Sequence, residues 1–198
     1  MPTPQATIRS ADITEIAACM ATLTRAFKGD PVCTWAWPDR ARYRDAFPRF
    51  CRAFGGDAFE AGTTHVDPEC KGVAMWLAPG TTPDDEAVIA VIRDSAPKRL
   101  QEPLFSLFEQ MDNYHPHEPH WHLPLIGVDP SQQGRGTGSA LLSHALKTCD
   151  EQQCLAYLEA TSPANVRLYE RQGFQAIGRV QAADSPPIIP MVRTPSRE

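Results

Sequence analysis

Long apolar runs are missing from this sequence of 198 residues, and so is an excess of positive charge. No stretch approaches the roughly 20 apolar residues that a membrane-spanning helix needs. Lys and Arg number 19 against 24 Asp and Glu, a formal net charge of −5, which argues against nucleic acid as a partner. The start, Met1-Pro2-Thr3-Pro4-Gln5, lacks the basic and apolar regions of a signal peptide. We therefore expect a cytoplasmic protein without membrane contact.

The cysteines lack the spacings that define metal sites or disulfide frameworks. There are six of them, with no CxxC pair and no Cys/His ligand spacing: Cys19, Cys33, Cys51, Cys70, Cys149 and Cys154. In a reducing compartment such residues are usually small buried apolar groups. We expect neither disulfides nor a structural metal.

The composition is that of an ordinary globular protein, with 42% hydrophobic and 22% charged residues. A chain of this length can bury one sizeable core and is short for two. The sequence contains no internal repeat and no linker. It predicts a single α/β domain over residues 1–198.

The first 119 residues show helical and strand patterns that glycine and proline interrupt. A short strand is expected over 6–9. Apolar residues behind Ser10 then recur at helical spacing up to Phe27, where Gly29-Asp30-Pro31 ends the helix. The sequence further predicts a loop over 32–38, a helix over 40–54, strands over 58–66 and 72–77, and mostly helical structure over 79–119.

From residue 121 onward strands and helices alternate, which predicts parallel neighbouring strands joined by crossover helices. Strands are expected over 121–128 and 154–160, helices over 137–150 and 164–172, and closing strands over 174–181 and 188–193. Pro124 cannot donate a ladder hydrogen bond, so it predicts a bulge or a splay point in its strand. Simple alternation places His122, Pro124, Ile126 and Val128 on one face.

A glycine-rich turn, Gln133-Gly134-Arg135-Gly136-Thr137-Gly138, joins the strand over 121–128 to the next helix. Glycine lets a ligand approach the backbone closely, and successive N–H groups at a helix start attract anions. The turn matches neither GxGxxG, because Ser139 replaces the third glycine, nor the phosphate loop GxxxxGK[ST]. By themselves the glycines predict a pyrophosphate site or simply a flexible turn.

The spacing Gln133-x-x-Gly136-x-Gly138 resembles the acetyl-CoA signature, Q/R-x-x-G-x-G/A, of the GCN5-related N-acetyltransferase (GNAT) superfamily. The later segment Asn165-x-x-Leu168-Tyr169-Glu170-Arg171-x-Gly173-Phe174, preceded by Glu159-Ala160, is similar to a helix of the same superfamily. Together these elements cover roughly residues 120–182. In the front half, Ala26-Phe27 to Asp30-Pro31 with Trp35 and Pro38-Asp39 resembles the branch near puromycin N-acetyltransferase.

The resemblance implies a GNAT-like mixed, twisted central sheet with flanking helices and two splayed parallel strands, here 121–128 and 154–160. It divides the domain into an acceptor-side half, about 1–119, and an acetyl-CoA-binding half, about 120–194. Acetyl-CoA is the implied acyl donor. The residues that the resemblance assigns to it are Ile126, Gly127, Val128, Gln133, Gly134, Arg135, Gly136, Thr137, Gly138, Ser139, Asn165 and Tyr169.

Acetyl transfer to an amine needs a proton acceptor, stabilisation of the negative thioester oxygen and a proton donor for the thiolate. Tyr169 occupies the superfamily's general-acid position, and otherwise it only packs its helix. A backbone N–H near Ile126 or Gly127 is the expected oxyanion donor. The candidate base is His122, with Glu118 and His120 close enough to act through a water. Alternatively, these histidines form a polar loop with one buried imidazole.

Two further groups of residues have side chains that could bind a ligand. The spacings between His115, His117, His120 and His122 do not suit a metal helix, so no metal is expected. Three aromatic residues either line an acceptor pocket or pack in the core: Trp35, Trp37 and Tyr43.

The sequence therefore predicts an N-acetyltransferase that acts on a primary amine of a small molecule. Two alternatives remain open: a protein N-terminal or lysine acetyltransferase, and a non-catalytic module that binds acetyl-CoA. Neither a monomer nor a homodimer is excluded.

Overall fold

A computed structural model describes residues 7–196 of the chain. One mixed sheet of seven strands runs through this part, in the order β1-β2-β3-β4-β5-β7-β6. Only β4 and β5 are parallel neighbours, and every other pair is antiparallel. The strand bounds are β1 Arg9–Ser10, β2 Thr64–Val66, β3 Gly72–Leu77, β4 His120–Val128, β5 Leu155–Ala160, β6 Gln175–Ala176 and β7 Ile189–Arg193.

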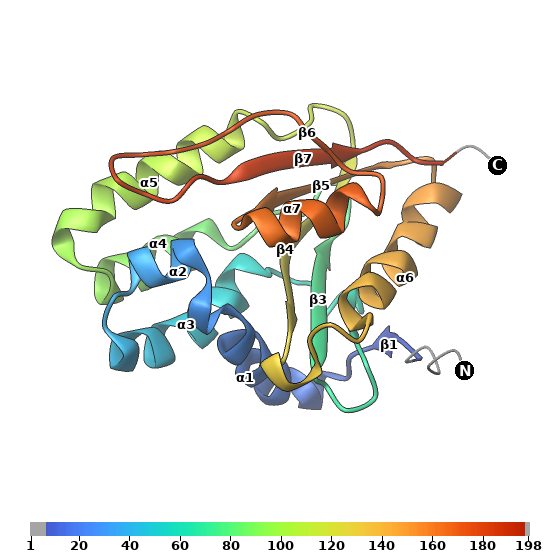
Figure 1. Cartoon of the computed structure of the whole chain (residues 1–198), viewed down its shortest axis with the longest axis horizontal. Coiled ribbons are helices and arrows are strands. Elements are labelled where there is room, and N and C mark those ends of the chain that lie inside the picture. The colour runs from blue at the N-terminus through green and yellow to red at the C-terminus, as the bar shows by residue number, and fades with distance from the viewer. Residues whose placement is uncertain (1–6, 197–198) are drawn as a thin grey trace.

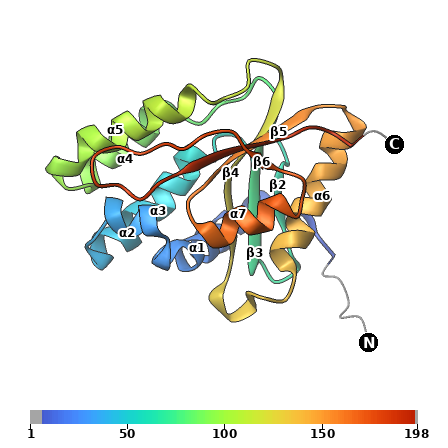
Figure 2. The same ribbon diagram turned by 45° about the horizontal axis from the view of Figure 1, so that its top comes forward.

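Helices cover both faces of the sheet, and the two faces are built from different halves of the chain (Figure 1). On one face lie α1 Ile16–Ala26, α2 Pro31–Ala36, α3 Arg40–Phe54, α4 Asp85–Ser95 and α5 Lys98–Asp112. The other face carries α6 Thr137–Glu151 and α7 Pro163–Glu170 (Figure 2). Three short 3-10 helices complete the described chain: η1 Ile13–Glu15, η2 Phe27–Gly29 and η3 Pro130–Gln132.

Alternate side chains of β3 belong to two different hydrophobic cores, one on each face of the sheet. Val73, Met75 and Leu77 pack under the front-half helices, whereas Ala74 and Trp76 pack under α6 and α7. Five of the six cysteines are buried, which confirms that they serve mainly as small apolar groups. No helix in the described part of the chain combines the length and the apolar character that crossing a membrane requires.

A bulge interrupts β4 at Pro124. Met75 pairs with Leu125 but Leu77 pairs with His122, so β4 has one residue more than β3 over this interval. Pro124 has no N–H to contribute to the ladder, and an extra residue is the usual way for a strand to accommodate it. The predicted irregularity at Pro124 is confirmed.

The bulge also corrects the predicted alternation along β4. His122 lies on the face of Leu77 and the front-half helices, while Ile126 and Val128 pack against the core under α6 and α7. His122 and Ile126 therefore lie on opposite faces, and the prediction that they share one was wrong. Strict alternation fails because the bulge shifts the pleat by one residue.

The pairing of β4 with β5 stops early. The four parallel pairs run from His120–Leu155 to Leu123–Leu158, yet β4 continues to Val128 and β5 to Ala160. Beyond Leu123 the two strands separate, and α1 approaches this part of β4 closely. A Cβ on Gly127 would lie 2.8 Å from the Cβ of Ala26, which is why only glycine fits there. The predicted splay of these two strands is confirmed.

Most predicted elements are confirmed, and three front-half predictions need correction. Residues 32–38 were expected as a loop, but α2 forms because the Asp30 carboxylate accepts hydrogen bonds from the N–H groups of Val32 and Cys33. The strand expected over 58–66 is reduced to β2, since the chain turns at Gly56 and Gly62, both with positive φ. The helix predicted behind Ser10 begins only at Ile13, as the 3-10 helix η1, which Asp12 caps.

At the chain ends the expected strands are shortened. The strand expected over 6–9 is β1, and its predicted first residue lies outside the described residues. The strand expected over 174–181 is reduced to β6 and a single bridge from Val180 to Ile188. Three Pro and Ser residues, Ser185, Pro186 and Pro187, precede that bridge and limit the ladder.

Candidate active site

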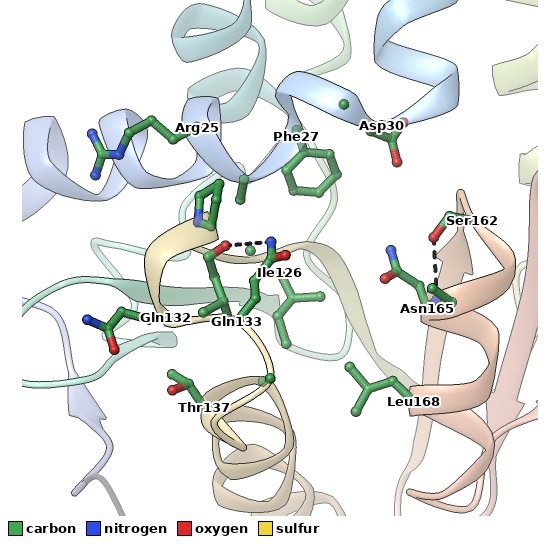
Figure 3. A pocket seen from close by; sticks show the side chains of 18 of the residues that line it. Arg25, Phe27, Asp30, Ile126, Gln132, Gln133, Thr137, Ser162, Asn165 and Leu168 are labelled. Carbon is green, nitrogen blue, oxygen red and sulfur yellow. Dashed lines mark hydrogen bonds between the residues drawn. The ribbon is translucent and has the colours of Figure 1, made fainter.

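A cleft of about 940 Å³ opens where β4 and β5 separate. Its floor is the free end of β4, Ile126 to Val128. The turn before α6 forms one wall and the first turns of α7 form the opposite one (Figure 3). Phe27 and Asp30, from the segment between α1 and α2, close the third side (Figure 3).

The glycine turn presents unpaired backbone N–H groups to this cleft. Gly136 is the N-cap of α6 with φ 87°, and no side chain caps the helix. Gly134 also has a positive φ, 74°, and a Cβ at either glycine would enter open space. Because the first N–H groups of a helix have no partner within it, the start of α6 can bind an anion. Gln133 supports the turn, since its Nε2 donates to the carbonyl of Val128 at 3.0 Å.

The charge around the cleft is positive although the chain as a whole is negative. Four cationic residues line it against a single acidic one, Asp30: they are Arg25, Lys28, Arg40 and Arg171. The Arg25 guanidinium is paired with Asp129 at 2.6 Å. The other three cations have no acidic partner among the described residues. This cleft therefore favours an anionic ligand.

Two of the polar side chains that line the cleft, Tyr169 and Asp30, are buried. Tyr169 lines the cleft and is 4% exposed, and burial raises the pKa of its phenol, so the hydroxyl keeps its proton at neutral pH. Asp30 is 9% exposed, and its Oδ2 accepts a hydrogen bond from the Thr161 hydroxyl. Burial raises the pKa of Asp30, and the hydrogen bonds that it accepts oppose the rise without cancelling it.

A second, smaller cavity of about 90 Å³ lies behind Asp30 and Thr161, on the face of the front-half helices. It reaches Pro124 and Leu125 of β4, next to the Ile126 that floors the cleft. Thr161 and Glu159 are its oxygen-bearing side chains among the described residues. Otherwise its walls are apolar, and most of the rings come from α3 and α5.

Glu159 is held by two histidines on the face of this cavity. Its Oε2 lies 2.9 Å from His122 Nε2, and its Oε1 lies 3.3 Å from His115 Nε2. Burial alone would raise the pKa of Glu159, but the two imidazoles together outweigh it and lower that pKa well below its usual range. An ionised carboxylate can only accept, so His122 donates through Nε2.

The donor atoms of His115, His122 and Glu159 lie within 4.8 Å of one another, a spacing that a metal site would also satisfy. The same atoms make the contacts between the Glu159 carboxylate and the two imidazoles. This group differs from the four histidines considered in the sequence, because it contains neither His117 nor His120 but does contain Glu159.

The predicted catalytic residues are divided between two places. Tyr169 lines the cleft, as expected of an acid. His122 lines neither cavity, and Glu118 and His120 lie at the outer start of β4, where His120 Nδ1 contacts the Glu118 carbonyl at 2.9 Å. The bulge at Pro124 is the reason, because it turns His122 away from the face of Ile126.

The predicted donor-binding residues gather around the cleft, with one exception. Those that line it are Ile126, Gly127, Val128, Gln133, Gly134, Gly136, Thr137, Gly138, Ser139, Asn165 and Tyr169. Arg135 does not line it, although it belongs to the same turn.

Of the predicted acceptor residues, only Trp37 lines the apolar cavity. Its indole Nε1 donates to Ser95 Oγ at 2.8 Å, and it is 5% exposed. Tyr43 is also buried and donates to the Thr24 carbonyl, and Trp35 donates to Asp184. Tyr43 and Trp37 also line a third cavity of about 530 Å³. Trp35 packs, partly buried, against the front-half core, which is the alternative that the sequence left open.

Comparison with known proteins supports the geometry. Residues 83–174 match the Acetyltransferase (GNAT) family. A solved structure from Corynebacterium glutamicum, described as histone acetyltransferase HPA2 and related acetyltransferase, superposes with a TM-score of 0.68. The two chains are 26% identical, and the superposition covers 98% of each. An uncharacterized N-acetyltransferase of Schizosaccharomyces pombe is 24% identical over 90% of this chain and 79% of its own length.

Over residues 83–174, just under half of its length, this chain matches the GNAT acetyltransferase family. It is an N-acetyltransferase. A mycothiol acetyltransferase of Streptosporangium roseum is 40% identical over 67 residues, which are 32% of this chain and only 20% of that enzyme. The GNAT resemblance of the glycine turn and of α7 is thus confirmed at the level of the family.

Three residues of this GNAT site were missed in the sequence: Asp30, Thr161 and Glu159. Asp30 was interpreted as part of a helix stop and of the branch resemblance, without a role of its own. It caps α2 and accepts a hydrogen bond from Thr161, 131 positions away in the chain. The sequence did contain one signal for Glu159. An acidic residue inside an apolar strand is expected to be buried, and a buried acid needs a partner.

The first prediction concerns the Glu159–His122 pair. His122→Ala should reduce the free energy of unfolding by about 3–5 kcal/mol at pH 7, because it leaves a buried carboxylate without its donor. In the wild type the lowered pKa of Glu159 stabilises the fold at pH values above the pKa that Glu159 has in the unfolded chain. This stabilisation is lost only in strong acid, as the pH falls through the folded-state pKa. Without His122, burial should raise that pKa, so protonation at pH 5 should shrink the deficit.

Urea unfolding at pH 7 and pH 5 measures both effects. The exposed His117→Ala serves as the control and should stay near wild type at both values. An equal loss at the two pH values would show that the His122 variant loses packing rather than charge pairing.

Proposed function

We propose that this N-acetyltransferase transfers the acetyl group of acetyl-CoA to a primary amine of a small molecule, as a single domain. The observation that carries the proposal is the junction of two dissimilar cavities at the hydrogen-bonded pair Asp30 and Thr161, with Tyr169 in the wall of the cleft. A cationic cleft with free backbone N–H groups suits a diphosphate, and an enclosed apolar cavity suits a small acceptor better than a protein segment. Acetyl-CoA would supply an acetyl group activated as a thioester.

The residues around the cleft fit acetyl-CoA. The N–H groups of Thr137, Gly138 and Ser139 at the start of α6 would bind the pyrophosphate, with Lys28 or Arg171 adding charge. The free edge of β4 beyond Leu123 offers backbone groups to the pantetheine arm. Asn165 extends from α7 on the opposite wall and would hydrogen bond the same arm (Figure 3).

The proton acceptor is assigned to Asp30, acting through Thr161. The Thr161 hydroxyl donates to Asp30 Oδ2, which leaves the lone pairs of Thr161 Oγ1 available to an amine in the apolar cavity. The amine N–H would pass its proton to Oγ1 while the hydroxyl proton moves to Oδ2. Burial raises the pKa of Asp30 and so makes it a better base than an exposed carboxylate. His122, the residue suggested by the sequence, lines neither cavity.

Tyr169 is assigned to protonate the departing thiolate. It lies in the cleft wall and keeps its proton at neutral pH because burial raises its pKa. A backbone N–H of the free β4 edge, near Ile126 or Gly127, would stabilise the developing oxyanion. The proposed assignment to a puromycin N-acetyltransferase branch is independent of these roles.

Thiol release from acetyl-CoA in the presence of a panel of small amines tests the proposed function. Release that depends on both amine and enzyme supports it. Release with peptide amines alone would favour a protein acetyltransferase instead. Tight acetyl-CoA binding without release for any amine would overturn the assignment of Asp30, Thr161 and Tyr169.

The glycine turn gives a second prediction. Gly136→Val should weaken acetyl-CoA binding by about tenfold or more, because a β-branched residue resists the φ of 87° and its side chain would enter the cleft. Calorimetry measures the affinity. Gly62→Val is the matched control, with a similar φ of 69° and open space around its Cβ but no place in the cleft. Equal losses in both variants would mean that general strain is responsible.

A third prediction tests the acid. Tyr169→Phe should lower kcat by roughly 100-fold, since general acid–base catalysis typically contributes that much or more, and leave acetyl-CoA affinity nearly unchanged. Steady-state kinetics and calorimetry separate the two quantities. Tyr114→Phe, outside the cleft, should retain wild-type kcat. A Tyr169→Phe variant with normal turnover would remove the assignment.

A fourth prediction tests the proton acceptor. Thr161→Val keeps the shape of the side chain but removes the hydroxyl between the amine and Asp30. We expect kcat to fall roughly 100-fold and Thr161→Ser to restore most of it. If the Val variant turns over normally while His122→Ala, corrected for its folded fraction, does not, the base belongs to the histidine side of β4.

A further inference from the structure

The apolar cavity behind Thr161 has a composition that specifies its occupant. Its walls include a group of six aromatic rings from η2, α3, α5 and the residue that follows α2: Phe27, Trp37, Phe47, Phe50, Phe54 and Phe108. The rings contact one another in edge-on, tilted or stacked geometry, with centroids 5.2–6.4 Å apart, so they form a continuous surface. Such a surface binds an apolar or aromatic group and offers nothing to a second charge.

One carboxylate stands at this otherwise apolar cavity. The Glu159 side chain is 5% exposed, and His122 holds its Oε2 at 2.9 Å. Its Oε1 is buried and has no hydrogen-bond donor among the described residues, although His115 lies 3.3 Å away. A buried carboxylate oxygen that accepts no hydrogen bond can still gain a donor, and an ammonium group is the donor that it would bind most strongly.

The position of the cavity matches the reacting end of the cleft. Pro124 and Leu125 line the cavity, and the next residue, Ile126, floors the cleft. Glu159 and Thr161 are two positions apart on the segment that ends β5, and both line the cavity. An amine bound at Glu159 therefore lies beside the Thr161 hydroxyl that leads to Asp30.

We propose that the acceptor is a primary monoamine with one compact apolar or aromatic substituent, seated among the six rings with its ammonium at Glu159. This inference rests on the proposed function and specifies its substrate class. At about 90 Å³ the cavity accommodates a group of roughly the size of one small ring. Diamines and polyamines are disfavoured, because their second charge would be buried without a partner.

The thiol-release assay can compare kcat/KM for two groups of amines. The first group is phenethylamine and isoamylamine, and the second is spermidine, agmatine and glycinamide. We expect kcat/KM for the first group to exceed that for the second by about 100-fold, because spermidine and agmatine would bury an unpaired second charge and glycinamide an unpaired amide. Glu159→Gln should raise KM for phenethylamine by about 10- to 100-fold, the loss expected for a hydrogen bond to a charged group. The exposed Glu170→Gln is its control.

A second variant keeps the proposal testable if Glu159→Gln folds poorly. Phe108→Ala enlarges the cavity and should shift the preference from phenethylamine toward the bulkier tryptamine. Phe105→Ala, on the same helix α5 but outside the cavity, should leave the ranking of amines unchanged. A merely structural role for Phe108 would lower all rates together without changing that ranking.

Binding of phenethylamine to the enzyme saturated with CoA, measured by calorimetry, separates the two hypotheses. If phenethylamine binds through Glu159 but no amine releases thiol, the inferred site stands and the proposed function falls. If spermidine or glycinamide is acetylated as well as phenethylamine, transfer stands and the inferred substrate class is overturned. Absence of phenethylamine binding also overturns it.

Discussion

The early end of the β4–β5 pairing is the constraint on which the site depends. Two parallel strands would normally continue their ladder, but the last pair is Leu123–Leu158 and the bulged Pro124 follows at once. A proline cannot donate to the neighbouring strand, and an extra residue turns the strand away from it. The gap that results exposes backbone groups of β4 to the cleft, where a ligand can satisfy them.

The same bulge gives the enzyme two unlike surfaces on one strand. After it, Ile126 and Val128 face α6 and α7, where the glycine turn gathers N–H groups and the cleft carries cations. Residues around it face the aromatic rings of the front-half helices. A charged donor and an apolar acceptor can thus approach the same point from opposite faces of the sheet. The cationic lining and the apolar lining therefore belong to separate cavities, one for each ligand.

Two buried carboxylates near this point are tuned in opposite directions. Burial raises the pKa of Asp30, whereas the imidazoles of His122 and His115 overcome burial and lower the pKa of Glu159. A carboxylate with a raised pKa accepts a proton more readily, and one with a lowered pKa keeps its charge and binds a cation. The proposed division into base and ammonium ligand follows from these environments.

Local signals made part of the structure predictable from the sequence. The helix at Arg40–Phe54 was predicted with its observed bounds, because Asp39 caps its start and Gly55-Gly56 follows its end. The glycine turn and Tyr169 were found because their motif spacing is local. By contrast, α2 was missed, since six residues are too few to show a helical period.

The junction of the two cavities could not be predicted in the same way. Asp30 and Thr161 are 131 positions apart, and His122 and Glu159 are 37 apart. Their contacts depend on the sheet order and on the register of β4, which the bulge shifts by one residue. A pattern of apolar residues reports which face a strand buries, but it does not reveal an inserted residue that moves every later side chain to the other face.

Asp30 links the folding of this region to its chemistry. A helix of six residues is unstable alone, so α2 depends on its cap and on packing. Asp30 Oδ1 supplies that cap through the N–H groups of Val32 and Cys33, which fixes the carboxylate and leaves Oδ2 for Thr161. Because the two oxygens serve separate partners, protonation at Oδ2 during transfer need not release the cap. The orientation of the proposed base is therefore set by the same hydrogen bonds that begin the helix.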